Sequence, residues 1–392
     1  MVALPLALAF GIGSGLGAQA GLVTAVIAGM LAAIFGGSKY QVSGPTGAMT
    51  VILIPIVATY GPVAVLQVGL MASGFLLLAA IFRLGKHIHR LPTSLIEGFT
   101  AGIALVIAMQ QVAFVLGVDL EASDHIWHSV FIEAQIWLKA PEFVALILGL
   151  IVVIVNVYGA SRWPRLPLAL ISVIVATWVA NLANLNLKRI GDLPSEFGQP
   201  NLDFLSAGNW LFLIPPALAV AFLAGLESLL SAKIADRLAK GEPHDPDREL
   251  LGQAVANLAV PFFGGVPATA ALARTAVNVR SGATSRLAAF SHSIFLLAFV
   301  LFVSGWIEQI PLTALGGVLI ATAYHMVRIE ELKKTARISR LDGWVLVITL
   351  IATVVLDLIS ALLIGLTIYL LLRRTQLSKK LIPIDQEETL GD

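Results

Sequence analysis

Long apolar runs separated by short polar stretches dominate the hydropathy pattern of this chain. Most of these runs approach the roughly 20 apolar residues that a helix needs to cross a bilayer. The pattern therefore predicts an all-α polytopic membrane protein with about 14 transmembrane segments. Full or nearly full spans are expected at 1–17, 20–36, 62–82, 92–116, 142–160, 166–186, 211–234, 247–263, 283–304, 311–326, 342–356 and 358–373.

Three further stretches do not fit a full span. Residues 47–60 and 268–279 are apolar but too short to cross a bilayer, and the second contains Arg274. An arginine at the bilayer centre costs at least a few kcal/mol, so its presence needs a reason. Residues 118–140 have spaced aromatic and acidic side chains and are expected to form an interfacial loop or helix.

Composition and charge support this interpretation. The chain is 58% hydrophobic and only 12% charged, about half the charged fraction of an ordinary soluble domain. With the N-terminus placed in the cytoplasm, every lysine and arginine falls on the inner side except Lys139, Lys188, Arg189 and Arg274. Such an asymmetry follows the positive-inside rule and predicts that both termini are cytoplasmic.

Several classes of function are excluded or disfavoured. The sequence has no cysteine, which excludes disulfides, thiol catalysis and thiolate metal sites. It has no phosphate-binding loop, so ATP-driven transport by this chain is not expected. His292 and His325 are isolated, and we find no paired acid–base groups, so neither a metal site nor an enzyme is predicted.

Two parts of the chain resemble each other. The second segment ends in "LAAIFGG" (31–37), the ninth ends in "LAVPFFGG" (258–265), and each is followed by a proline-bearing linker and a short helix. Seven segments separate the copies, an odd number, which predicts a 7+7 inverted repeat. Chance similarity between helices rich in glycine and alanine is the alternative. Interrupted short helices at matching positions of inverted halves indicate a substrate site near the midplane.

The two short helices are expected to meet with their N-termini. Pro45 and Pro267 lie near the helix starts, where a missing N–H does no harm. Each helix end offers unpaired N–H groups and about half a positive charge, which together favour an anion. Arg274 adds a full charge, unless it extends to the cytoplasmic edge of the membrane. Thr46 and Ala271 are expected within about 15 Å, roughly ten residues of helical rise.

Glu227 is interpreted as the carboxylate that lies far from a membrane edge, in the middle of the segment 211–234. An ionisable group inside the membrane is a functional candidate, although a structural carboxylate held by Ser228 or Ser231 is the alternative. Protonation of Glu227 would make the site more positive and favour anion binding, which is the basis of proton–anion symport. A sodium ion beside Glu227 could act in the same way.

The chain resembles the sulfate permease (SulP) family, also called solute carrier family 26. The resemblance rests on "LPLALAF" (4–10), "GSKYQVSGPTGAMT" (37–50), "GLESLLSAKIADR" (225–237) and "GGVPATAALARTAVNV" (264–279). It implies anion transport, a homodimer, and core and gate domains. The substrate-binding positions that it implies are Phe10, Thr46, Gly47, Ala48, Ala270, Ala271, Ala273 and Arg274.

The coupling positions that the resemblance implies are Glu227 and Ser231. Bicarbonate-carrying cyanobacterial members have an aspartate and a threonine there, resembling a sodium site, so sodium coupling stays an open alternative. Family members usually end in a cytoplasmic STAS domain. The tail at 376–392 is too short to form one and is expected to lead to a domain that is absent or removed.

The resulting division of residues 1–375 gives a core of about 1–83 and 211–304 and a gate of about 92–186 and 311–375. The predicted function is secondary active transport of a small anion by elevator-like alternating access, with no cofactor besides a coupling proton or Na⁺. Dicarboxylates such as fumarate, bicarbonate and sulfate are candidate substrates. Proton-coupled symport in the inner (cell) membrane is the main expectation. A sodium-coupled bicarbonate symporter, or an uncoupled exchanger or channel, is the alternative.

Overall fold

The computed structural model describes residues 3–90, 92–119, 126–163, 166–191, 200–206, 208, 210–239, 241–356 and 358–374. The tail at 376–392, expected to lead to a STAS domain, lies outside the described residues. The helices of the first half are α1 (Ala3–Gly13), α2 (Ala18–Phe35), α3 (Gly47–Tyr60), α4 (Pro62–Ile81), α5 (Thr93–Gln110), α6 (Val112–Leu116), α7 (Ile126–Lys139), α8 (Phe143–Arg162) and α9 (Leu168–Leu182). Those of the second half are α10 (Ile214–Ala239), α11 (Pro246–Ala259), α12 (Leu272–Arg280), α13 (Leu287–Ile307), α14 (Leu312–Met326), α15 (Ile329–Ile338), α16 (Arg340–Val355) and α17 (Leu358–Arg374).

The helices follow the predicted apolar segments closely. Seven helical stretches of the described chain are long and apolar enough to cross a membrane, and α1, α3, α9 and part of α17 are shorter apolar helices. The protein is therefore a multi-pass, mainly helical membrane protein. The exact number of 14 crossings and the inverted symmetry between the halves stay predictions.

One expectation about a helix start was wrong. Residues 268–271 belong to the predicted short helix, but they are extended, and α12 begins only at Leu272. The reason is backbone pairing: strand β2 (Thr269–Ala270) hydrogen-bonds to strand β1 (Ser43–Gly44). Arg274 consequently lies in the first turn of α12, whereas a helix that began at residue 268 would place it at the seventh position.

Helix α15 lies between the predicted spans 311–326 and 342–356, where the hydropathy pattern predicts no membrane segment. It is a short amphipathic helix whose one buried residue is Thr335, and it packs on α16 and α5. A search for long apolar runs does not detect such a helix, since its apolar residues recur only at helical spacing.

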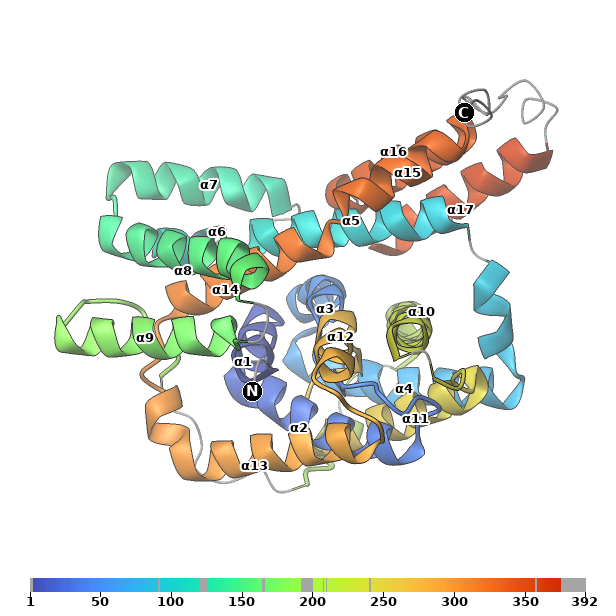
Figure 1. The fold of residues 1–392 in the computed structure, drawn as a ribbon, viewed down its shortest axis with the longest axis horizontal. Coiled ribbons are helices and arrows are strands. Elements are labelled where there is room, and N and C mark those ends of the chain that lie inside the picture. Colours follow the sequence, from blue (N-terminus) through green and yellow to red (C-terminus); the bar gives the residue numbers. More distant parts are fainter. Residues whose placement is uncertain are drawn as a thin grey trace, which may run out of the picture.

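Three tiers of helices are visible in Figure 1. Helices α5 to α8 and α14 to α17 form the upper tier, and α2, α4, α11 and α13 form the lower tier, while α1, α3, α10 and α12 lie between them. The packing agrees with this picture: α11 packs on α2 and α4, and α16 packs on α5. Helix α3 contacts α4 below and α5 above.

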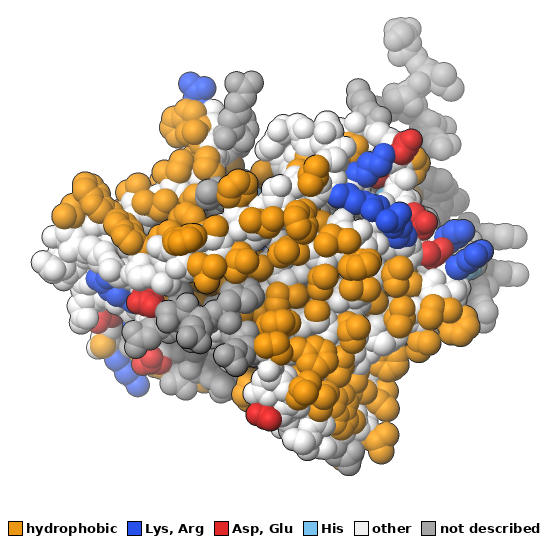
Figure 2. Space-filling view, turned by 90° about the horizontal axis from the view of Figure 1, so that it is seen from below, with side chains coloured by type: hydrophobic (Ala, Val, Ile, Leu, Met, Phe, Trp, Pro, Cys, Tyr) orange, Lys and Arg blue, Asp and Glu red, His pale blue; other side chains and the backbone are white. Residues whose placement is uncertain are grey.

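Large apolar side chains cover much of the outer surface. Figure 2 shows hydrophobic side chains spread over the face seen from below, with lysines and arginines gathered toward its margins. Helices α8, α9 and α13 expose residues such as Tyr158, Leu182 and Phe302, the last of which is 85% exposed. Such a surface is unfavourable in water and suits the hydrocarbon core of a bilayer.

Candidate anion site

The two strands bring the starts of the short helices together. In the antiparallel pair Ser43 lies opposite Ala270 and Gly44 opposite Thr269, and the N–H of Ala271 donates to the carbonyl of Val42 at 3.2 Å. Helices α3 and α12 therefore leave the pair from opposite ends. Thr46 lies two residues after Gly44, and Ala271 directly follows Ala270, so the two helix starts flank the strand pair. The expected approach of Thr46 and Ala271 stays a prediction.

Thr46 connects the start of α3 to α10. Its hydroxyl accepts from the N–H of Met49 at 3.4 Å, which makes Thr46 the N-cap of α3. The same hydroxyl donates to Oε2 of Glu227 at 3.0 Å. Thr46 is buried, whereas Glu227 is partly exposed. A single side chain thus satisfies a helix end and binds the candidate coupling carboxylate.

The first residues of α3 pack tightly against α1 and α5. A Cβ atom added at Gly47 would lie 3.1 Å from Cε1 of Phe10 and 2.2 Å from Cδ1 of Ile107. Ala48 is buried, and Phe10 is only 6% exposed. A side chain at position 47 would therefore displace the end of Ile107, and the aromatic ring of Phe10 packs directly against the start of α3.

Arg274 is buried at the junction of β1 and α3. The side chain is 5% exposed, and its Nη2 donates to the carbonyl of Pro45 at 2.8 Å. Its Nε and Nη1 are buried and have no hydrogen-bond partner among the described residues. The arginine therefore does not extend to the cytoplasmic edge, and two of its three nitrogen atoms have no acceptor among the described residues.

Gly44 makes room for this guanidinium. Its φ is +153°, and a Cβ atom added there would lie 2.8 Å from Nη1 of Arg274 and 3.2 Å from the Cα of Ala25. Both the backbone conformation and the space therefore require glycine.

Helix α10 packs against both short helices and holds β2 in place. The hydroxyl of Thr269 donates to the carbonyl of Ala224 at 3.1 Å, so the 3.0 Å contact with Ser228 uses the Ser228 proton. The oxygen of Ser228 in turn accepts from the N–H of Ala270 at 3.1 Å. Ser228 thus anchors the strand rather than Glu227. Ser231, one turn further, is fully buried and its hydroxyl has no partner among the described residues.

The three alanines around Arg274 differ in exposure. Ala270 is buried in β2, Ala271 is partly exposed at the N-cap of α12, and Ala273 is exposed. The side chain of Ala271 cannot accept a hydrogen bond, so the N-cap residue leaves the N–H groups in the first turn of α12 without a side-chain acceptor.

Two carboxylates that the sequence analysis did not single out are buried more deeply than Glu227. Glu249 in α11 is 1% exposed and Glu133 in α7 is 2% exposed. Distance from a segment end does not decide burial, because neighbouring helices and loops cover both positions. Sequence reasoning also missed Gln253 and Asn257, although polar residues four apart in a predicted span were a visible signal.

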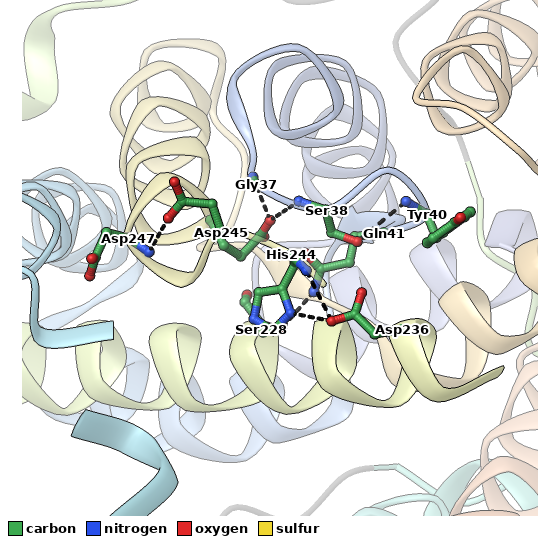
Figure 3. Close-up of polar contacts among 10 residues, drawn as sticks. Gly37, Ser38, Tyr40, Gln41, Ser228, Asp236, His244, Asp245 and Asp247 are labelled. Atoms are coloured by element: carbon green, nitrogen blue, oxygen red, sulfur yellow. Dashed lines mark hydrogen bonds and ion pairs between the residues drawn. The ribbon is translucent and has the colours of Figure 1, made fainter. Parts of the chain in front are cut away.

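Figure 3 shows how the loop after α2 lies across α10 beside the start of α11. The Nε2 atom of Gln41 donates to the carbonyl of Ser228 at 2.5 Å, and Nδ1 of His244 contacts Oδ2 of Asp236 at 2.6 Å. Asp245 is the N-cap of α11 and Pro246 its first residue. The contact of Gln41 holds the loop that leads into β1 against α10, and the other two order the connection between α10 and α11.

Comparisons with known proteins now identify the class. The profile of the sulfate permease family matches residues 1–349. The candidate sulfate transporter YvdB of Bacillus subtilis is 37% identical over 373 residues, covering 93% of this chain and 70% of YvdB. The bicarbonate transporter BicA of Picosynechococcus is 29% identical over 377 residues, covering 93% of this chain and 66% of BicA. The chain thus spans about two thirds of these relatives.

Solved structures show the same fold. The transmembrane domain of a cyanobacterial bicarbonate transporter, BicA, superimposes with a TM-score of 0.84 at 29% identity, covering 92% of this chain and 94% of that one. The murine Solute Carrier 26 family member A9 anion transporter has a TM-score of 0.86 at 17% identity, covering 95% and 66%. Fold and sequence together define a membrane transporter of anions and not an enzyme. The chain belongs to the sulfate permease family.

Proposed function

We propose that this chain is a secondary active transporter that binds a small anion between the N-termini of α3 and α12. The observation that carries the proposal is the state of Arg274, whose buried Nε and Nη1 lack partners among the described residues. A buried charge that is not fully hydrogen-bonded costs free energy. A bound anion would supply both the missing acceptors and the missing negative charge.

The position of Arg274 in α12 strengthens this argument. It is the third residue of the helix, at the end where the helix dipole is positive. A cation there is repelled by its own helix, and the start of α3 adds a second positive end. Arg274 and the two helix ends together present about two positive units, so an anion is the natural occupant.

The substrate is proposed to be small. Gly47, Ala48, Ala270 and Ala271 leave little side-chain bulk around the helix starts, and the ring of Phe10 bounds one side. Sulfate and bicarbonate are the anions in the names of the relatives. A short dicarboxylate such as fumarate is also small and carries the negative charge that the positive site would bind.

Glu227 is the proposed coupling group. It contacts Thr46 directly and is near enough to the site to change its net charge when it gains a proton. Ser231 supports the alternative of sodium coupling, because its buried hydroxyl lies one turn from Glu227 and has no partner among the described residues. Uncoupled exchange or conduction through the same site is the third possibility, and the transport experiment below separates the three.

The proposed movement is an elevator-like shift of a core against a gate. Phe10, Thr46, Glu227 and Arg274 all belong to the helices proposed as core, about 1–83 and 211–304. The site could therefore move as one unit past the proposed gate, about 92–186 and 311–375, from which Ile107 reaches the start of α3. A homodimer in the inner membrane with cytoplasmic termini completes the proposal.

The test is uptake of labelled sulfate, bicarbonate and fumarate into proteoliposomes under a proton gradient, a sodium gradient or neither. Accumulation that requires a proton gradient supports proton-coupled symport, and accumulation that requires sodium supports the alternative coupling. Exchange or conductance without accumulation identifies an uncoupled carrier or channel. Absence of saturable uptake for all three anions would contradict the proposed substrate class.

A further inference from the structure

A stripe of buried polar side chains runs along α11. Glu249, Gln253 and Asn257 follow one another at intervals of four residues, so they share one face of the helix. Each is at most 1% exposed. Polar groups this deeply buried in a membrane protein are costly unless they make specific hydrogen bonds. Their partners therefore indicate what the stripe does.

The first two residues bind the loop and strand that lead into α3. Oε2 of Glu249 accepts from the N–H groups of Gly37 and Ser38, at 3.0 Å and 3.1 Å. The Nε2 group of Gln253 donates both to Oε1 of Glu249 and to the hydroxyl oxygen of Ser43, each at 2.9 Å. Through Gln253, α11 holds β1 itself.

The third residue binds the linker that leads into α12. Nδ2 of Asn257 donates to the carbonyl of Ala268 at 2.9 Å, and the N–H of Ala268 donates to Oδ1 of Asn257 at 2.7 Å. The side-chain amide thus pairs with both backbone groups of the residue just before β2. One face of α11 consequently binds both β1, through Ser43, and the residue that precedes β2, Ala268.

The strand pair needs such support. It consists of two opposed residue pairs, Ser43 with Ala270 and Gly44 with Thr269. So short a ladder is at most marginally stable without further contacts, and a slip of one residue would turn every side chain to the other face. A slip would also change the distance between the helix starts that flank Arg274.

We propose that Gln253 and Asn257, supported by Glu249, are positioning residues that set the register of β1 against β2. They thereby determine the spacing of the two helix N-termini, and with it the affinity and the size selectivity of the site for anions. This inference rests on the proposed anion site. It assigns to α11 a part in substrate selection without any contact with the substrate.

The test compares dissociation constants for sulfate and for bicarbonate in the purified full chain carrying Gln253→Met, Ser43→Ala, both together, or Asn257→Asp. Loss of a buried hydrogen bond should weaken binding about fivefold or more. The ratio of the two constants should change as well, because the anions differ in size. Ser43→Ala should add little to Gln253→Met, since both remove the same contact.

The matched control is Asn156→Leu, which removes a buried amide in α8 that bonds to Val152 and Ser172, away from the strands. It should lower the melting temperature without altering the ratio of constants. If Gln253→Met does not fold, Ser43→Ala breaks the same contact from the strand side and decides the question. Unchanged constants in the strand and α11 variants, or an equal change of ratio in the control, overturn the inference.

The outcome is separable from that of the proposed function. If the unmodified protein binds neither anion, the anion site is wrong and this inference falls with it. If Arg274→Ala abolishes binding while Gln253→Met, Ser43→Ala and Asn257→Asp leave both constants unchanged, the site stands and the positioning role is wrong.

Discussion

The hydroxyl of Thr46 donates a hydrogen bond of 3.0 Å to Oε2 of Glu227, a residue 181 positions later in the chain. Thr46 is at the same time the N-cap of α3, the helix whose start faces the proposed anion. The carboxyl group of Glu227 and the start of α3 are therefore linked through one side chain. This contact is the route for the proposed coupling and leads to the first prediction.

Glu227→Gln should separate exchange from accumulation. Glutamine imitates the protonated carboxyl, so downhill exchange of labelled anion should persist, while proton-driven accumulation should fail. Thermodynamic linkage requires this, because a proton that no longer binds cannot change the affinity for the anion. Uptake in proteoliposomes with and without an imposed pH gradient is the measurement.

Ser231→Ala, assayed in the same way, tests the alternative coupling ion. If accumulation in the unmodified protein depends on sodium, Ser231→Ala should weaken that dependence. Proton-driven accumulation that survives in Glu227→Gln would refute the coupling role of Glu227.

Arg274→Ala should reduce anion affinity about 10- to 100-fold at every pH, because a charged hydrogen-bonding group contributes about 1.5–3 kcal/mol. Arg274→Lys should recover only part of the loss, since an ammonium group cannot reproduce the planar guanidinium. Binding of labelled sulfate and bicarbonate to the purified protein is the measurement. Arg280→Ala is the control, because Arg280 is exposed at the far end of the same helix and should have little effect.

Gly44→Ala should weaken anion binding through Arg274. The added methyl group would lie 2.8 Å from Nη1 of Arg274, so the guanidinium must move. The unfavourable φ adds a loss of about 1 kcal/mol or more in stability. Gly61→Ala is the matched control, since Gly61 also has a positive φ but nothing within 4 Å of the added atom. Both variants should lose stability in thermal denaturation, and a loss of affinity in both would show that strain alone is responsible.

Ala271→Leu should abolish binding in a folded, monodisperse protein. Ala271 is the N-cap of α12 and partly exposed, so a larger side chain can be accommodated by the fold but would cover the N–H groups at the helix start. Size-exclusion chromatography and anion binding are the two measurements. Unchanged affinity would place the anion elsewhere.

The hydropathy of the chain was enough to predict most helices, because each span must be long and apolar wherever it lies in the bilayer. The predicted segment 62–82 becomes α4 (Pro62–Ile81), and 142–160 becomes α8 (Phe143–Arg162). Hydropathy did not predict α15, because this amphipathic helix is too polar. It also did not predict the extended residues before α12, because their conformation depends on pairing with β1.

The sequence by itself determined the helical membrane class, the two short segments and the family, because apolar length and motif residues are local properties. It also indicated Glu227 and Arg274 as ionisable residues inside predicted membrane segments, and the family resemblance added Thr46. Only the tertiary structure decided that Arg274 lies against Gly44 and Pro45, that Ser228 anchors β2, and that α11 holds both strands. Most of these contacts join residues that lie more than 40 positions apart in the sequence. The exception is the contact of Asn257 in α11 with the nearby Ala268. A sequence specifies such contacts only through the packing of the whole chain.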